Sequence, residues 1–188
     1  MSLQNAILGL LTYQSMSGYD LKNVFDKSIN FFWHAQLSQI YRELGTLESK
    51  GFASSHIEPQ EVRPDRKVYS ITREGERSFH EWLGKFPQKL LPPVRDEFNM
   101  RIFFGSALPR EEIAFQLKRF IKEMKEELNF YRTVETIIEE YSKEVSRSGE
   151  KFYWGLTLKK GYFMAEAQIC WAEECLRELK QKTEVEGC

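Results

Sequence analysis

Cysteine and histidine are both scarce in this chain of 188 residues, with three of each. An odd number of cysteines without a C-x-x-C pair excludes a disulfide framework and the usual zinc motifs. The three histidines stand far apart in the sequence. We therefore expect reduced thiols, a cytoplasmic protein and no bound metal.

Long apolar runs and an excess of charge are missing as well. No stretch approaches the roughly 18 apolar residues of a membrane span, so no membrane partner is expected. The first residues, MSLQNAILGLL, lack the basic start and small-residue cleavage site of an export signal and predict a packed helix. A net charge of −1 gives no general affinity for polyanions, so any surface that binds nucleic acid must be local.

Signatures of catalysis are absent from the sequence. There is no G-x-S-x-G, H-E-x-x-H, phosphate-binding-loop or dinucleotide-binding pattern. We expect no enzyme activity and no cofactor. The composition, 41% hydrophobic and 29% charged, is instead that of a globular protein with a sizeable core.

Residues 1–86 change from helical to strand periodicity and back to helical. The predicted elements are helices at 3–12, 18–27 and 37–50, strands at 52–58 and 66–71, and a helix that Thr72 caps. Ser17 and Asp20 have the spacing of a capping box, and Gly51 marks the end of the third helix. This element order is that of a winged helix-turn-helix domain, although unrelated folds can share such an order.

A proline-rich connector, PQKLLPPVRDE at 87–97, separates this domain from a helical second half. Residues 98–182 begin with a short helix ended by Gly105. A helix of about 39 residues, on the order of 58 Å long, follows, and a last helix runs antiparallel to it. Residues 183–188 are predicted to be a disordered tail. The predicted fold class is therefore mainly α with a small β-hairpin: an N-terminal winged helix and a C-terminal long-helix dimerisation domain.

Apolar residues recur along the long helix at spacings of three and four for more than about four heptads. A two-helix arm cannot cover such a stripe alone, so a second copy is predicted to complete it in a homodimer. The residues predicted at the dimer interface are Leu117, Phe120, Met124, Leu128, Tyr131, Ile138 and Trp171. The alternative is a monomer whose helical hairpin packs back on the first domain.

The third helix has a polar face without acidic residues. On a helical wheel, the stripe predicted to face the core consists of Leu37, Ile40, Leu44 and Leu47. The opposite face carries Ala35, Ser38, Gln39, Arg42 and Thr46. Small residues allow close approach to a duplex, and Gln and Arg can bond to base edges, so this face predicts a helix that enters a DNA major groove. A merely solvated face is the alternative, although in a chain with 28 acidic residues it would normally contain some of them.

Cations near the second helix and the hairpin predict contacts with DNA phosphates. Arg63, Arg66 and Lys67 lie at the tip and foot of the hairpin, where neighbouring acids dilute their charge. Lys22 on the second helix is a further candidate, with a plain surface role equally open. Tyr41, at the edge of the buried stripe, could reach a phosphate through its hydroxyl.

Two long stretches of the sequence carry a set of linked motifs: AILGLLTYQSMSGYDLKNVFDKSINFFWHAQLSQIYRELGTLESKGF and RKVYSITREGERSFHEWL. The motifs are an ILGLL-type first helix, SGY-[DE]-[LI] at the start of the second, Q-[IL]-Y-x-x-L-x-x-L-E-x-x-G in the third, and Y-x-[IL]-T-x-x-G after the hairpin. With these motifs the sequence resembles the PadR family of bacterial transcriptional regulators. The ending YWGLTLKKG…CWAEECLREL resembles the larger subgroup, whose helical C-terminal domain is similar to that of a virulence-gene activator.

The resemblance implies a homodimer that binds double-stranded DNA at a palindromic operator, usually as a repressor. It does not identify the effector, because family members respond to phenolic acids, drugs or other small aromatic compounds and some have no known effector. We expect a small aromatic or other effector that relieves repression. The residues that could line its cavity are Trp33, Phe98, Phe103 and Trp154, with a plain role in the core as the alternative. A protein–protein adaptor that uses the same scaffold without binding DNA stays open as an alternative function.

Overall fold

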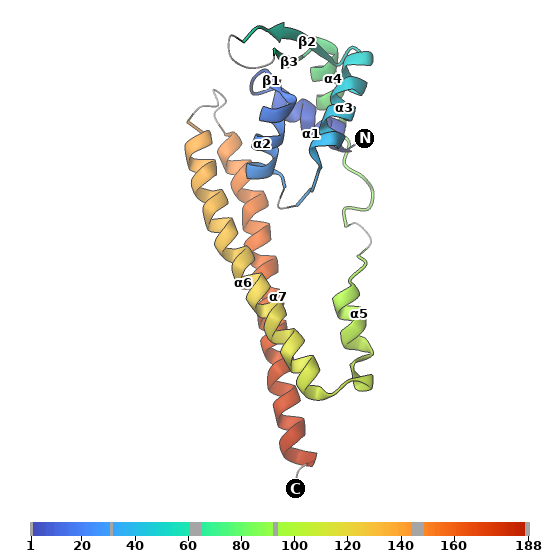
Figure 1. Ribbon diagram of the computed structural model, residues 1–188, viewed down its shortest axis with the longest axis vertical. Coiled ribbons are helices and arrows are strands. Elements are labelled where there is room, and N and C mark those ends of the chain that lie inside the picture. Colours follow the sequence, from blue (N-terminus) through green and yellow to red (C-terminus); the bar gives the residue numbers. More distant parts are fainter. Residues whose placement is uncertain (1, 31, 61–64, 92–93, 144–148, 187–188) are drawn as a thin grey trace. The chain divides into compact units, whose positions relative to one another are not determined.

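The computed structural model describes residues 2–30, 32–60, 65–91, 94–143 and 149–186. The chain divides into two compact units, residues 1–90 with 141–148 and residues 91–140 with 149–188, and each unit is described by itself. Figure 1 labels the α-helices and strands of both. Most of the described chain is helical, with one small antiparallel sheet, as the sequence predicts.

In its described residues, the first unit combines four helices with a three-stranded sheet. Its elements are α1 (Ser2–Leu11), β1 (Met16–Ser17), α2 (Gly18–Ser28), α3 (Leu37–Ser49), β2 (Ala53–Glu58), β3 (Arg66–Ile71) and α4 (Arg73–Gly84). In the sheet β3 is central, with β1 and β2 antiparallel to it on either side. The β2–β3 hairpin, here called the wing, pairs Ala53 with Ile71 and Glu58 with Arg66.

Strand β1 is a difference from the prediction, which contained a two-stranded hairpin only. Its two residues, Met16 and Ser17, pair with Tyr69 and Val68 of β3. A strand of this length has no alternation of apolar and polar residues, so periodicity cannot reveal it. Because Met16 is fully buried, the short pairing also joins the sheet to the core.

The core of this unit lies between its first three helices and the sheet. The largest fully buried side chains are Ile7, Leu8, Met16, Leu21, Phe25, Ile40, Leu44 and Leu47. Burying one such side chain stabilises a fold by about 1.5–3 kcal/mol. Leu37 departs from the stripe predicted for α3, since it is exposed. It is the first residue of the helix and stands one turn before the buried stretch begins.

A capping box fixes where α2 begins, and a glycine fixes where α3 ends. The backbone N–H of Asp20 donates to Ser17 Oγ (3.2 Å), and the backbone N–H of Ser17 donates to the Asp20 carboxylate (3.1 Å). This is the reciprocal capping box that the sequence predicts. Gly51 follows α3 with a φ of 70°, the left-handed conformation in which glycine ends helices.

Strand β3 runs into α4 through a close junction at Thr72. The Thr72 hydroxyl donates to the carbonyl oxygen of Gly51 (2.6 Å) and accepts the backbone N–H of Gly75 (3.1 Å). The backbone N–H of Thr72 donates to the carbonyl oxygen of Phe52 (3.1 Å). A Cβ atom on Gly75 would lie 2.0 Å from that same oxygen, so this approach requires glycine. The T-x-x-G motif therefore ties the wing, α4 and the end of α3 together.

The second unit consists of α5 (Glu97–Phe103), a 3-10 turn η1 (Gly105–Ala107), α6 (Arg110–Tyr141) and α7 (Glu150–Glu186). Helix α6 has 32 residues and ends at Tyr141, so it is shorter than the helix that the sequence predicts. The prediction was too long because the apolar spacing of three and four continues in the sequence beyond Tyr141. Helix α7 reaches Glu186, so residues 183–186 extend it and the tail prediction is wrong there. Residues 187 and 188 lie outside the described residues.

Among the described residues, no helix combines the length and the apolar character that crossing a membrane requires.

Helices α6 and α7 lie antiparallel and side by side (Figure 1). Leu117 of α6 packs in one cluster with Ala172 of α7. Further along, a Cβ on Gly161 would lie 2.9 Å from the ring of Tyr131. Leu117 and Tyr131 are only 1% and 7% exposed. The sequence placed both residues at a dimer interface, and that prediction is corrected here, because helix α7 of the same chain already covers them. A helical wheel of α6 alone identifies its apolar side but not the helix that covers it.

Candidate nucleic-acid interface

The outer face of α3 presents most of the residues that the sequence predicts to read bases. Ser38, Gln39 and Arg42 are exposed, and Thr46 is half-buried. The Arg42 side chain is 69% exposed, and its guanidinium lies 3.5 Å from the Glu43 carboxylate. That contact is at the limit of hydrogen-bond length, so the guanidinium is held weakly and can reorient toward a ligand.

Ala35 does not belong to this face. It lies two residues before α3 and is only 6% exposed, as part of the core of the first unit. The backbone at Gln36 is extended (φ −80°, ψ 151°), so the helical angle of 100° per residue no longer applies before Leu37. The prediction that Ala35 contacts DNA is therefore wrong.

Some polar groups of the face are already engaged in holding the helix. The backbone N–H of Gln36 donates to Gln39 Oε1 (2.8 Å), which leaves the amide nitrogen of Gln39 as a donor. The hydroxyl of Thr46 donates to the backbone carbonyl oxygen of Arg42 (3.0 Å). The hydroxyl of Ser49 donates to the backbone carbonyl oxygen of Thr46 (2.9 Å). Donors from Ser38, Gln39 and Arg42 therefore carry most of the hydrogen-bonding capacity of this face toward a base edge.

The phenol ring of Tyr41 fixes the distance between α3 and the start of α2. A Cβ on Gly18 would lie 2.4 Å from Cε1 of that ring, so only glycine permits the contact. Tyr41 is nevertheless 47% exposed. Its ring therefore packs on α2 while the residue keeps an exposed edge, which is consistent with the predicted phosphate contact.

Three of the predicted phosphate-binding cations form ion pairs. Arg66 pairs with Asp20, Lys22 pairs with Asp26, and Lys67 Nζ lies 2.8 Å from Glu48 Oε2. These pairs are partly exposed, so each one alone contributes little to stability. The fourth cation, Arg63, lies outside the described residues.

The acids beside α3 are turned toward the protein. Glu43 accepts a hydrogen bond from Gln4 Nε2 of α1 (2.6 Å). Hydrogen bonds from Lys67 and Ser55 hold the pKa of the Glu48 carboxyl below its ordinary value, and Glu48 raises the pKa of Lys67. Both members of that pair are therefore charged at neutral pH.

Asp20 is held in the same way at the start of α2. Partial burial raises the pKa of its carboxyl, but hydrogen bonds from Ser17 and the Arg66 guanidinium outweigh that effect and lower it overall. The sequence indicated Asp20 only as a helix cap. Its contact with the wing is a functional feature that spacing along the chain does not reveal.

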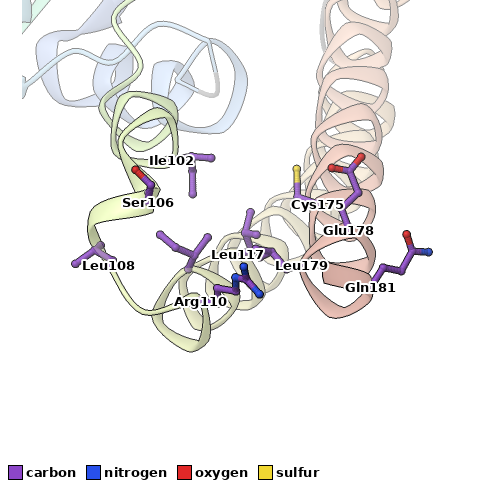
Figure 2. Close-up of a pocket in the computed structure, with 11 residues that line it drawn as sticks. Ile102, Ser106, Leu108, Arg110, Leu117, Cys175, Glu178, Leu179 and Gln181 are labelled. Atoms are coloured by element: carbon purple, nitrogen blue, oxygen red, sulfur yellow. The ribbon is translucent and has the colours of Figure 1, made fainter. Parts of the chain in front are cut away.

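The second unit contains a cavity of about 790 Å³ near the start of α6 and the C-terminal part of α7 (Figure 2). Its wall includes the apolar residues Ile102, Leu108 and Leu117 and the charged residues Arg110 and Glu178. This volume is in the range of pockets that hold small molecules. A mainly apolar wall with a few charged groups suits an amphipathic ligand.

The four aromatic residues predicted to bind a ligand are not among the described residues that line this cavity. Phe98 stacks on Phe120, with ring centroids 4.8 Å apart. Phe103 is 82% exposed, and Trp154 is half-buried on α7. Trp33 belongs to the first unit and is exposed. The sequence missed the cavity because its wall combines aliphatic and polar residues from α5, η1, α6 and α7, which lie far apart in the sequence.

These features define a class of protein. Helix α3 has a polar, exposed face and packs against α2 where the Tyr41 ring meets Gly18. A two-stranded wing with cations at its foot forms ion pairs with both helices. This is the arrangement of a winged helix-turn-helix regulator, in which the second helix of the motif faces the major groove.

The chain belongs to the PadR family of transcriptional regulators, which are not enzymes. Its residues 7–81 match the transcriptional regulator PadR-like family, and residues 94–180 match the virulence activator α C-terminal domain. The negative transcriptional regulator PadR of Bacillus subtilis is 30% identical over 174 residues, which cover 93% of this chain and 95% of that protein.

Solved structures of Bacillus subtilis PadR share the fold. The structure in complex with operator DNA has a TM-score of 0.81 at 31% identity, covering 95% of this chain and 99% of that chain. The structure in complex with p-coumaric acid has a TM-score of 0.76 at 30% identity, covering 96% and 99%.

Proposed function

We propose that this chain is a homodimeric repressor in which α3 of each copy enters the major groove at one half of a palindromic operator. The observation that carries the proposal is the exposed, weakly held guanidinium of Arg42 beside Ser38 and Gln39. The complex of Bacillus subtilis PadR with operator DNA, and its description as a negative regulator, support DNA binding and repression. Since the partner is chromosomal, we also propose a cytoplasmic location.

Operator binding should weaken steeply as salt rises. Each phosphate neutralised by a cation releases counterions, so the logarithm of the affinity falls by about 0.9 per contact for each tenfold rise in salt. With several such contacts, we expect affinity for a duplex from upstream of the chain's own gene to fall more than about tenfold between roughly 50 and 200 mM salt. Fluorescence anisotropy measures this. A folded protein that binds no duplex at low salt would favour the adaptor alternative.

A second copy is the proposed cover for apolar side chains that remain exposed on the second unit. Phe103, Phe115 and Phe163 are 82%, 55% and 60% exposed. Exposed aromatic side chains in this number are typical of an interaction surface. Five of the predicted interface residues are not fully covered by their own chain, and we propose that the second copy contacts them. They are Phe120, Met124, Leu128, Ile138 and Trp171.

The cavity in the second unit is the proposed site of an effector that relieves repression. The structure of Bacillus subtilis PadR with p-coumaric acid supports a small aromatic acid as the ligand class. The apolar wall, with Leu108 and Leu117, suits an aromatic ring. The Arg110 guanidinium would pair with a carboxylate, and Glu178 would accept a hydrogen bond from a hydroxyl group.

Filling the cavity should abolish the response to the effector. Ser106 lines the cavity from η1 and is exposed, so Ser106→Trp can place an indole there without disturbing a buried core. We expect p-coumaric acid to release the wild-type protein from its operator and to leave the variant bound, measured by anisotropy. Ala107→Trp changes the next residue, which is also exposed and does not line the cavity; this matched control should respond like wild type. If Ser106→Trp still releases DNA, the cavity is not the effector site.

A further inference from the structure

The wing places two adjacent cations on β3, yet they contact different helices. Neighbouring residues of a strand point to opposite faces of a sheet. Arg66 pairs with Asp20 at the start of α2, and Lys67 Nζ lies 2.8 Å from Glu48 Oε2 on α3. The wing is thereby attached to both helices of the helix-turn-helix.

Glu48 joins three elements of the first unit. Its carboxylate accepts hydrogen bonds from Lys67 of β3 and from the Ser55 hydroxyl of β2. The Lys67 ammonium also lies 5.0 Å from the centroid of the Tyr69 ring. Both strands of the wing are therefore fixed to the C-terminal half of α3, by more than the single contact of an ordinary surface ion pair.

Asp20 orders the wing at the other helix. Its carboxylate accepts hydrogen bonds from the Ser17 hydroxyl (2.6 Å) and backbone N–H (3.1 Å) and from the Arg66 guanidinium. Because the same carboxylate completes the capping box of α2, the start of that helix and the foot of the wing are held together.

The described part of the wing consequently offers less free positive charge than its sequence indicates. A free cation gains a phosphate contact on any duplex, whatever the sequence. A cation paired with a carboxylate must first give up that partner. The pairing therefore lowers affinity for random DNA, while base contacts from α3 distinguish the operator.

We propose that Glu48 and Asp20 are positioning and specificity-determining residues. They hold the wing in a fixed position relative to α3 and keep its cations from pairing with the phosphates of random DNA. The operator complex depends on this fixed position, because α3 must reach the bases while the wing contacts the DNA backbone. Binding to random DNA depends on charge alone. The inference rests on the proposed function and names how the same surface discriminates between duplexes.

Glu48→Gln tests the inference in the full chain. The amide keeps the shape and can still accept from Ser55, but it removes the charge that pairs with Lys67. The wild-type protein first selects its operator from a pool of random duplexes, and affinities for that operator and a scrambled duplex are then measured across a salt series. We expect the variant to bind the scrambled duplex about two- to fivefold more tightly, with a salt dependence steeper by about 0.9, equal to one added phosphate. Operator affinity should rise less, so the ratio of the two affinities falls.

Glu74→Gln is the matched control. It also removes one carboxylate from an exposed ion pair, with Arg77 on α4, and should leave the affinity ratio at the wild-type value. The double variant Glu48→Gln/Lys67→Gln should lose the added salt dependence. The inference is overturned if Glu48→Gln behaves like Glu74→Gln, or if it weakens binding to both duplexes equally. Failure of the wild-type protein to select any operator would instead overturn the proposed function.

Discussion

Replacing Arg42 with alanine is expected to weaken operator binding by about 1–3 kcal/mol, or about 5- to 150-fold. Its side chain is 69% exposed on the outer face of α3, and its contact with Glu43 is 3.5 Å long. The guanidinium can therefore turn to donate two hydrogen bonds to one guanine. The buried face of the helix, with Ile40 and Leu44, is untouched by the change. Equilibrium anisotropy on the selected operator at fixed salt measures the loss.

Arg77→Ala is the matched control for this experiment. Arg77 lies on α4, its side chain is 66% exposed, and it contacts Glu74 at 3.2 Å, so the variant loses the same charge from a similar environment. We expect its operator affinity to stay within about 0.5 kcal/mol of wild type. Unchanged operator binding by Arg42→Ala would exclude Arg42 as a base reader. An equal loss on the operator and a scrambled duplex would assign it to a phosphate contact.

Local chemistry explains why much of the first unit could be predicted from sequence. The capping box of Ser17 and Asp20 involves residues three apart, and the left-handed turn at Gly51 depends on that residue alone. The apolar spacing of α3 correctly places Ile40 and Leu44 in the core. Each of these features is decided by neighbours within about one helical turn, which is the range that a sequence pattern covers.

Contacts between distant residues could not be predicted in this way. Arg66 and Asp20 are 46 positions apart, and Lys67 and Glu48 are 19 apart. Periodicity does not indicate which acid meets which cation. The sequence therefore indicated a cationic wing diluted by acids, whereas the structure has specific ion pairs. Ala35 was misplaced for a different reason, since the helical wheel was extended beyond the start of α3.

The same limit explains the corrected dimer residues in the second unit. A spacing of three and four identifies the apolar side of α6, but the helix that covers each part of it is decided by tertiary packing. Helix α7 of the same chain covers Leu117 and Tyr131. Phe163, on α7 itself, stays exposed and is a better marker of a surface that a second copy covers.

A single methyl group at Gly75 is expected to destabilise the first unit by on the order of 3 kcal/mol. The added Cβ of Gly75→Ala would lie 2.0 Å from the carbonyl oxygen of Phe52 and 3.0 Å from Ile71 Cγ1. That oxygen accepts the backbone N–H of Thr72 (3.1 Å), so moving it away breaks a hydrogen bond at the end of the wing. At about 4–8 °C per kcal/mol for a domain of this size, the melting midpoint should fall by more than about 10 °C.

Gly84→Ala in the same helix separates this clash from a general effect of alanine. At Gly84 no described atom outside the adjacent stretch of its own helix lies within 4 Å of the Cβ position, and alanine favours a helix over glycine by up to about 1 kcal/mol. This control should melt at or slightly above wild type in scanning calorimetry. Because Thr72 also bonds to Gly51 after α3, Gly75→Ala should lose operator affinity together with stability. Equal melting of the two variants would mean that the approach of Phe52 does not require glycine at position 75.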